Sequence, residues 1–165
     1  MIRKSKRYSR PKKLYQTGRI KEENALLEKY GLKNKREVWK ALAKVNYYRS
    51  RAKALVRAPS EEQQVLFAKL QHIGLKAETI ADVLALKLDD LLQRRLPSIV
   101  ARKGFATTPQ HARQMVIHKK VTIAGKVVNI PSYIVSIDEE SAIVVEAPRK
   151  PAPKKETAPI AEVTA

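Results

Sequence analysis

Arginine and lysine clusters are the residues of this sequence whose types and spacing could do chemistry. An arginine fork donates paired hydrogen bonds to phosphate oxygens, and the first turn of a helix offers free backbone N–H groups to an anion. The second half of the chain holds two such clusters, at the ends of a predicted pair of helices, which could form a concave basic face. The expected binding residues there are Arg94, Arg95, Arg102, Lys103, Gln110, Arg113, His118, Lys119 and Lys120.

A second basic set lies in the first third of the chain. Residues 1–21 hold nine basic side chains together with Tyr8 and Tyr15, and we expect an arm that its partner orders. A solvated tail is the alternative for the arm, and a solvated charged face is the alternative for the helix that follows. The candidate binding residues are Arg3, Lys4, Lys6, Arg7, Arg10, Lys12, Lys13, Lys40, Lys44, Arg49 and Arg51.

The charge balance indicates a polyanionic partner. The 165 residues include 34 Lys and Arg against 16 Asp and Glu, a formal net charge of +18. Residues 1–57 carry nineteen of the basic residues and only four of the acidic ones, so most of the positive field lies in the first third. A field of this size favours nucleic acid or an anionic membrane surface. Because the chain has no cysteine, it can form neither disulfides nor thiolate metal sites.

Membrane association is the weaker of these two interpretations. No apolar run approaches the roughly 20 residues of a membrane helix, and the N-terminus lacks the apolar segment of a secretion signal. It is basic enough for an organelle transit peptide, but Pro11 interrupts any long amphipathic helix there. A basic amphipathic helix could lie on anionic lipid, yet the apolar stripes of this chain are better used against one another.

An enzymatic role finds little support in the residue pattern. His111 and His118 share a helical face, and His72 lies elsewhere, but no carboxylate or cysteine stands at ligand spacing beside them. Asp89 and Asp90 suit a helix start, and the acidic run 138–140 is expected to be a solvated turn. We therefore expect no catalytic residue, no metal and no cofactor.

The first half of the chain is predicted to be helical. A short helix should end at Gly31, and a long one should run from Asn34, which forms a capping box with Glu37, to about Arg57. At 1.5 Å per residue this rod is roughly 34 Å long and can contact several phosphates. Its inward stripe comprises Val38, Leu42, Val45, Arg49, Ala52 and Val56, with Lys40, Lys44 and Arg51 on the other side. Helices at 60–73, with a Ser60 and Gln63 capping box, and at 80–84 should follow.

The second half is predicted to be a compact module. A helix from Leu88 should kink or break at Pro97 and end at Gly104, and another should run from Thr108 to about His118. Strands are expected on both sides of a turn at residues 124–126, at 133–137 and at 142–145. The predicted class is α+β, with a basic extended arm at 1–24, a helical domain at 25–87, an RNA-binding module at 88–146 and a Pro/Lys/Ala tail at 147–165.

The stretch from Gly104 to Val135 resembles the RNA-binding module named after small-subunit ribosomal protein S-four. The family pattern has the form T-x-x-x-A-R-x-(L/M)-(V/I)-x-x-x-x-(V/I)-x-(V/I)-x-G-x-x-V-N-x-P-S-(Y/F). It is matched by Thr108, Ala112, Arg113, Met115, Val116, Val121, Ile123, Gly125, Val128, Asn129, Pro131, Ser132 and Tyr133. The same module also occurs in pseudouridine synthases, some tRNA synthetases and a ribosome-associated heat-shock family.

The flanking segments extend the resemblance to about residues 3–145, toward the archaeal and eukaryotic branch of the ribosomal family itself. The resemblance implies a non-enzymatic protein of the cytoplasmic small subunit that binds the 5′ domain of its rRNA at a multi-helix junction, early in assembly. It also implies neighbouring ribosomal proteins, a place near the mRNA entry path and an influence on decoding accuracy, with no membrane or small-molecule partner. Two features depart from the family: Pro97 within a helix, and the lack of the cysteine zinc cluster that some bacterial members carry. A free RNA chaperone or a translational repressor is the remaining alternative.

Overall fold

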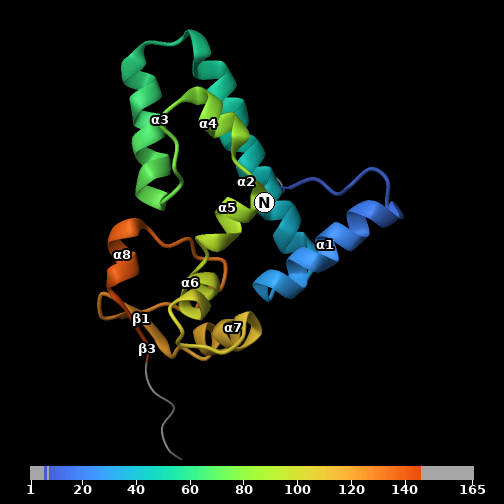
Figure 1. The fold of residues 1–165 in the computed structure, drawn as a ribbon, viewed down its shortest axis with the longest axis vertical. Helices are drawn as coiled ribbons and strands as arrows, with labels where there is room; N and C mark the ends of the chain where they lie inside the picture. Colours follow the sequence, from blue (N-terminus) through green and yellow to red (C-terminus); the bar gives the residue numbers. More distant parts are fainter. Residues whose placement is uncertain (1–5, 7, 146–165) are drawn as a thin grey trace, which may run out of the picture.

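The computed structural model describes residue 6 and residues 8–145, which fold into helices and one small sheet (Figure 1). In chain order the elements are α1 (Thr17–Tyr30), α2 (Lys35–Ala54), the 3-10 helix η1 (Leu55–Arg57), α3 (Ser60–Ile73), α4 (Ile80–Ala85), α5 (Leu88–Gln93), α6 (Leu96–Arg102), α7 (Pro109–Ile117), β1 (Val121–Ile123), β2 (Lys126–Val127), α8 (Ile137–Ser141) and β3 (Ile143–Val145). Helices α2, α3 and α4 form an upper part, and α6 to α8 with the sheet form a lower part. The α+β prediction is confirmed.

The upper part is built on α2, whose apolar residues recur at steps of three and four. Val45, Tyr48 and Ala52 are buried against Leu66 and Leu70 of α3. The stripe predicted for α2 is therefore largely confirmed. Two of its members, Leu42 and Val56, are 44% and 55% exposed instead.

Helix α1 begins earlier than the predicted arm boundary, so residues 17–24 are helical rather than extended. The Arg19 guanidinium donates to the carbonyl oxygens of Lys13 and Leu14 at 2.9 and 3.0 Å and pairs with Glu23. Helix α1 therefore holds the chain before it in place. At its other end, Gly31 has φ +59° and caps the helix as predicted.

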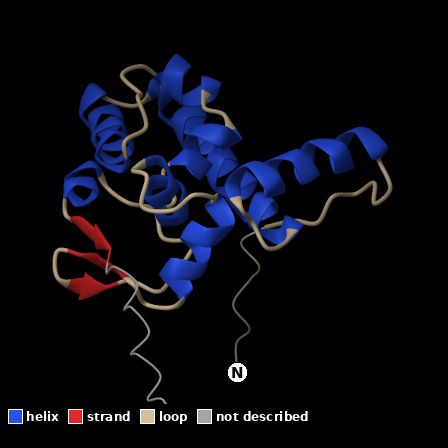
Figure 2. Cartoon of the chain, turned by 60° about the horizontal axis from the view of Figure 1, so that its bottom comes forward, coloured by secondary structure: helices blue, strands red, loops and turns tan. Residues whose placement is uncertain are grey.

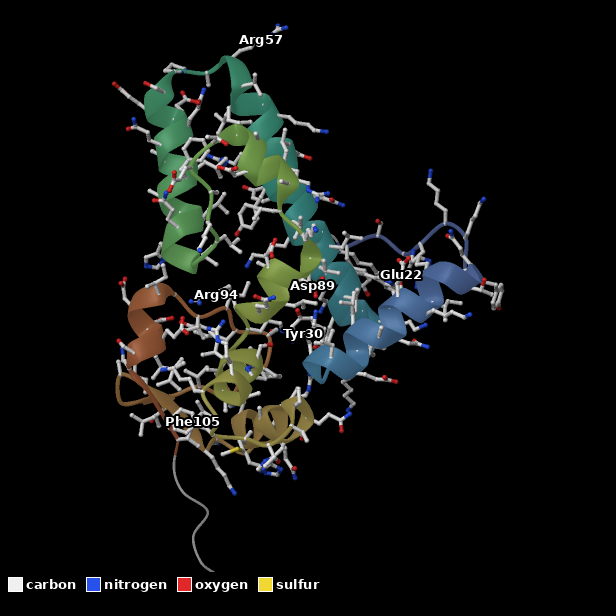
Figure 3. The ribbon with its side chains drawn as sticks, viewed as in Figure 1. Glu22, Tyr30, Arg57, Asp89, Arg94 and Phe105 are labelled. Atoms are coloured by element: carbon white, nitrogen blue, oxygen red, sulfur yellow. The ribbon has the colours of Figure 1, made fainter. Side chains whose placement is uncertain are left out.

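Tyr30 of α1 and Asp89 of α5 connect these two helices, as Figure 3 shows. The Tyr30 hydroxyl donates to Asp89 Oδ1 at 2.7 Å, and Lys29 Nζ lies 3.0 Å from the same oxygen. These contacts hold the pKa of Asp89 below its ordinary value, the Tyr30 hydrogen bond being the largest cause. Asp89 and Asp90 both lie in the first turn of α5, as expected from the helix dipole.

The lower part is the predicted two-helix module with its sheet, drawn in red in Figure 2. The antiparallel strand order is β2-β1-β3, and Thr122 pairs with Val127 on one side and Val144 on the other. Thr108 caps α7 by accepting from the His111 N–H at 3.1 Å. The buried core includes Ile99, Val100, Ala112, Met115, Val116 and Val121.

Pro97 marks the predicted interruption. Helix α5 ends at Gln93 and a separate helix, α6, begins at Leu96 with Pro97 in its first turn, where a missing N–H costs nothing. Leu91 of α5 packs in the upper core, whereas the lower core starts at Leu96. Helices α5 and α6 thus contribute to different cores, and the boundary at residue 88 stays a prediction.

The prediction of a strand at 133–137 is wrong. The segment makes one isolated bridge, between Arg95 and Ile134, and its last residue begins α8. Ser136 caps α8, with Glu139 completing a capping box. The acidic run is consequently no solvated turn: Glu139 accepts from the Tyr133 hydroxyl at 2.7 Å, and Glu140 pairs with arginines.

Two predicted capping boxes are also absent. Asn34 and Pro59 are the N-cap residues of α2 and α3, but neither makes a side-chain cap hydrogen bond. Gln63 donates instead to the carbonyl oxygens of Leu55 and Ala58, both at 3.0 Å. Glu37 reaches away from its own helix, across to the lower part.

Glu37 joins α2 to the lower part through two arginines. Its Oε2 accepts from Arg95 at 2.7 Å, and both of its oxygens accept from Arg113 of α7, at 2.9 and 2.7 Å. Burial alone would raise the pKa of Glu37, but the hydrogen bonds from Arg113 and Arg95 outweigh it and hold that pKa below its ordinary value.

Arg94 makes the equivalent connection on the other side, and Figure 3 shows it in the interior near α8. It donates to the carbonyl oxygens of Ile73 and Val135 at 2.8 and 3.1 Å, and to Glu140 at 2.6 Å. Arg102 binds the second Glu140 oxygen at 2.7 Å. Gly74 permits this packing, because a Cβ there would lie 2.7 Å from the Arg94 guanidinium carbon.

Glu37→Gln should destabilise the protein. The substitution leaves Arg95 and Arg113 partly buried without an anion, a situation that costs about 3 kcal/mol or more. Chemical denaturation should show this fall in the free energy of unfolding. Glu22→Gln, which replaces an exposed glutamate of α1, is the matched control and should behave as wild type. Equal stability of the two variants would contradict a role for Glu37 in joining the two parts.

The same cluster predicts a loss of stability in acid. Because the folded pKa of Glu37 is lowered, its contribution is present above the unfolded value, about 4.3, and is lost as pH falls through the folded pKa. Unfolding free energies measured from pH 6 downward should fall less steeply in Glu37→Gln than in wild type. Asp89 and Glu140, whose pKa values are also lowered, should leave a residual slope. If the unfolding free energies of wild type and Glu37→Gln fell in parallel with pH, protonation of Glu37 would not be linked to folding.

Candidate RNA-binding surface

Arg94 and Arg95 are not part of an exposed basic face, which corrects the expectation from the sequence. They are 8% and 6% exposed, and glutamates and backbone carbonyls satisfy their guanidinium groups. Arg113 is half-buried and bidentate to Glu37. Buried charges require such partners, so these three arginines support the fold. Replacing them together would not leave the fold intact.

Arg49 has a similar structural role. It is half-buried, and its guanidinium donates to the carbonyl oxygen of Leu86, the residue that caps the end of α4. Arg102 remains half-exposed although it pairs with Glu140, and Lys103 is exposed while donating to the Glu140 carbonyl. Of the four basic residues predicted around α6, only Arg102 and Lys103 are therefore exposed enough to reach a ligand.

The start of α7 is covered rather than open to an anion. Gly31 packs against it so closely that a Cβ at position 31 would lie 2.7 Å from the Pro109 carbonyl carbon and 2.8 Å from the Gln110 nitrogen. Thr108 already accepts from the His111 N–H. The expected phosphate site on the free N–H groups of this helix is therefore not present, although the Gln110 side chain itself is exposed.

The end of α7 presents the remaining basic residues of the lower part. His118 and Lys119 are exposed, and Lys120 is half-buried. Lys119 has φ +61°, in the left-handed region that glycine usually occupies after a helix, and the Lys120 N–H closes the turn on the Met115 carbonyl at 3.1 Å. A lysine therefore stands in a strained position where a glycine would be unstrained.

The described part of the N-terminal segment presents another exposed basic set: Lys6, Arg10, Lys12 and Lys13. Arg19 holds the backbone at Lys13, and the Tyr8 ring lies 6.3 Å from that of Trp39. The described arm is thus supported by α1 and α2 before any partner is present. Arg3, Lys4 and Arg7, and the predicted tail at 147–165, lie outside the described residues.

A large cleft of about 1210 Å³ lies between α2, α3 and the segment before α8. Lys40 and Lys44 of α2 line it, together with Tyr47 and with Lys69 of α3. The sequence reasoning missed Tyr47 and Lys69. Helical spacing could have revealed Tyr47, because positions 37, 40, 44 and 47 follow one another at steps of three and four and therefore share one face of α2. Arg51, also predicted, is exposed on the same helix.

The described part of the chain holds no candidate metal-binding cluster and no candidate membrane-spanning helix. Among these residues, no group of three or more His, Cys, Asp or Glu could hold a metal ion. Within the same residues, no helix is both long and apolar enough to cross a membrane.

Comparisons with known proteins agree with this geometry. The S4 domain family matches residues 94–141, which include α6, α7 and the sheet strands β1 and β2. "Small ribosomal subunit protein uS4" of Methanococcus aeolicus is 41% identical over 148 residues, covering 86% of this chain and 84% of that protein. The proteins of the same name from Ignicoccus hospitalis and Methanothermobacter thermautotrophicus are 42% and 43% identical, covering 91% and 84% of this chain and 93% and 84% of their own lengths. The chain therefore belongs to the uS4 family of small ribosomal subunit proteins.

Proposed function

We propose that this chain is a structural, non-enzymatic constituent of the small ribosomal subunit that binds small-subunit rRNA. The observation that carries the proposal is the similarity, over most of the chain, to proteins named small ribosomal subunit protein uS4. The net charge of +18 supports it, because exposed lysines and arginines bind phosphates and release counterions.

The proposed binding surface consists of the predicted binding residues that are exposed, together with the half-buried Lys120. They are Lys6, Arg10, Lys12, Lys13, Lys40, Lys44, Arg51, Arg102, Lys103, Gln110, His118, Lys119 and Lys120, which occupy both the upper and the lower part. Their spread over helix ends and surfaces suits folded RNA, which proteins recognise mainly by shape, phosphate and 2′-OH.

The finer role follows from the family resemblance. It comprises binding to the 5′ domain of the rRNA at a multi-helix junction, nucleation of assembly, contact with neighbouring ribosomal proteins and with mRNA near its entry path, and a contribution to decoding accuracy in the cytoplasm. No membrane or small-molecule partner is included. The backbone strain at Lys119 supports placing the module's contacts at the end of α7, since strain persists where function requires it.

Binding to a small-subunit 5′-domain rRNA fragment tests the proposal. The full chain should bind it tightly in the presence of excess tRNA. The affinity should also fall steeply with salt: in a plot of log binding constant against log salt concentration, each phosphate contact should contribute about −0.7 to −0.9 to the slope. Binding that tRNA abolishes would leave only general polyanion affinity and would favour the chaperone alternative.

Lys119→Gly should separate binding from stability. Glycine relieves the left-handed strain, so the free energy of unfolding should equal the wild-type value or exceed it by up to about 1 kcal/mol. Affinity for the rRNA fragment should fall nonetheless, and the salt slope should decrease by about one phosphate contact. Lys119→Gln should lose the same affinity without the gain in stability.

The control for this pair is Lys76→Gln, which removes an exposed lysine outside the proposed set. It should change affinity less than Lys119→Gln does. If Lys119→Gly bound with wild-type affinity and salt slope, the end of α7 would not be part of the binding surface.

A further inference from the structure

We propose that the cleft beside α2 holds an unpaired nucleotide of the RNA, with its base stacked on Tyr47 and its phosphates held by lysines at the rim. This inference rests on the proposed function and deepens it. It assigns a chemical class of ligand, a single-stranded nucleotide, to a cleft whose Tyr47 and Lys69 the sequence pattern did not reveal.

The size and lining of the cleft suit a nucleotide. Its volume of about 1210 Å³ is large enough for a nucleotide, since ordinary small-molecule pockets measure ~300–1,000 Å³. Its walls include the half-buried apolar side chains Ile73, Pro131 and Ile134. Apolar walls offer nothing to a phosphate group, but they suit the face of a base that has left its stack.

Tyr47 is placed to receive such a base. Its side chain is 55% exposed although it lines the cleft, and its ring centroid lies 5.7 Å from that of the buried Tyr48. Tyr48 belongs to the upper core, and burial raises the pKa of its hydroxyl, so it remains neutral. A fixed neighbour thus supports the Tyr47 ring while leaving much of it open, which is the arrangement of an aromatic stacking platform.

The positive charge lies around this platform. Lys44 and Lys40 stand about one and two turns before Tyr47 on α2, over about 10 Å of helix, and Lys69 approaches from α3. Lys6 and Tyr8 close one end of the cleft, where Lys40 Nζ lies 5.9 Å from the Tyr8 ring centroid. Phosphates on both sides of a stacked base would therefore meet cations from different elements.

Glu37 adds a negative charge to the less exposed part of the cleft lining. It is the one carboxylate among the described residues that line the cleft, and Arg95 and Arg113 already occupy its oxygens. One carboxylate cannot balance two guanidinium groups, so this cluster keeps a net charge of +1. Arg95 and Arg113 are nevertheless less exposed than the lysines and already donate hydrogen bonds to Glu37, so the exposed lysines are the more accessible partners for phosphate. The base is thus directed inward and the phosphates toward the lysines. A double helix would need the opposite arrangement, with cations facing phosphates throughout the contact.

Tyr47→Ala and Tyr47→Phe in the full chain test the stacking, with the small-subunit 5′-domain rRNA fragment as the probe. The alanine variant should lose about tenfold or more in affinity, with an unchanged salt slope because no charge is removed. The phenylalanine variant should bind as wild type, and both should keep wild-type thermal stability because Tyr47 lies outside the core. Ultraviolet cross-linking followed by mass spectrometry should place a nucleotide adduct on Tyr47.

Lys69→Gln tests the phosphate contacts of the same site, with Lys76→Gln as its matched control. Lys69→Gln should lower the salt slope, and Lys76→Gln should lower it less. If wild type bound the fragment while Tyr47→Ala bound equally well, the inference would be wrong and the proposed function would stand. Equal losses in Tyr47→Phe and Tyr47→Ala would overturn stacking in favour of a hydroxyl contact. Failure of wild type itself to bind would overturn both proposals.

A protein segment in the cleft is the remaining outcome. In that case Tyr47→Ala and Lys69→Gln would leave affinity for the rRNA fragment unchanged but reduce incorporation of the chain into small subunits. That result would overturn the nucleotide site.

Discussion

Two adjacent arginines at the break between α5 and α6 hold the two parts of this molecule together. Arg95 faces Glu37 of α2, and Arg94 faces Glu140 of α8. An arginine keeps its charge when it is buried, so each guanidinium requires an anion and backbone carbonyls around it. Because each glutamate also binds a second arginine, the two clusters fix the positions of α7 and of the end of α6 as well.

This internal pairing shapes the surface that faces a polyanion. The two clusters contain four arginines and only two carboxylates, so these arginines are paired with carboxylates of the protein itself and the surface charge rests mainly on other lysines and arginines. The exposed cations of the proposed surface belong to the N-terminal segment, α2, the end of α6 and the end of α7, and these helices pack in the core. A binding surface on rigid elements loses less conformational entropy on association than one on free loops.

The fold was predictable where local pattern decides structure. The α2 stripe, the Thr108 cap and the turn at residues 124–126 all depend on neighbours in sequence, and the structure confirms them. The errors fell where long-range partners compete with local ones. Glu37 fits a capping box by spacing, but Arg95 and Arg113 offer it three charge-assisted hydrogen bonds, which outweigh one bond to a backbone N–H. Arg94 and Arg95 look like surface cations in sequence, since only the tertiary structure reveals carboxylates 46 and 58 residues away.

The same partners bear on the cleft that we propose as a nucleotide site. Glu37 occupies hydrogen-bond donors of Arg95 and Arg113, the less exposed arginines of the cleft, whereas Lys40, Lys44 and Lys69 are exposed. A site with charge at its edge and aromatic and apolar groups within distinguishes an unstacked nucleotide from a regular helix, whose phosphates face outward and whose bases are shielded. In the proposed binding mode, loss of Glu37 would release Arg95 and Arg113 to bind phosphate in the cleft, so it should affect both stability and the selection of RNA.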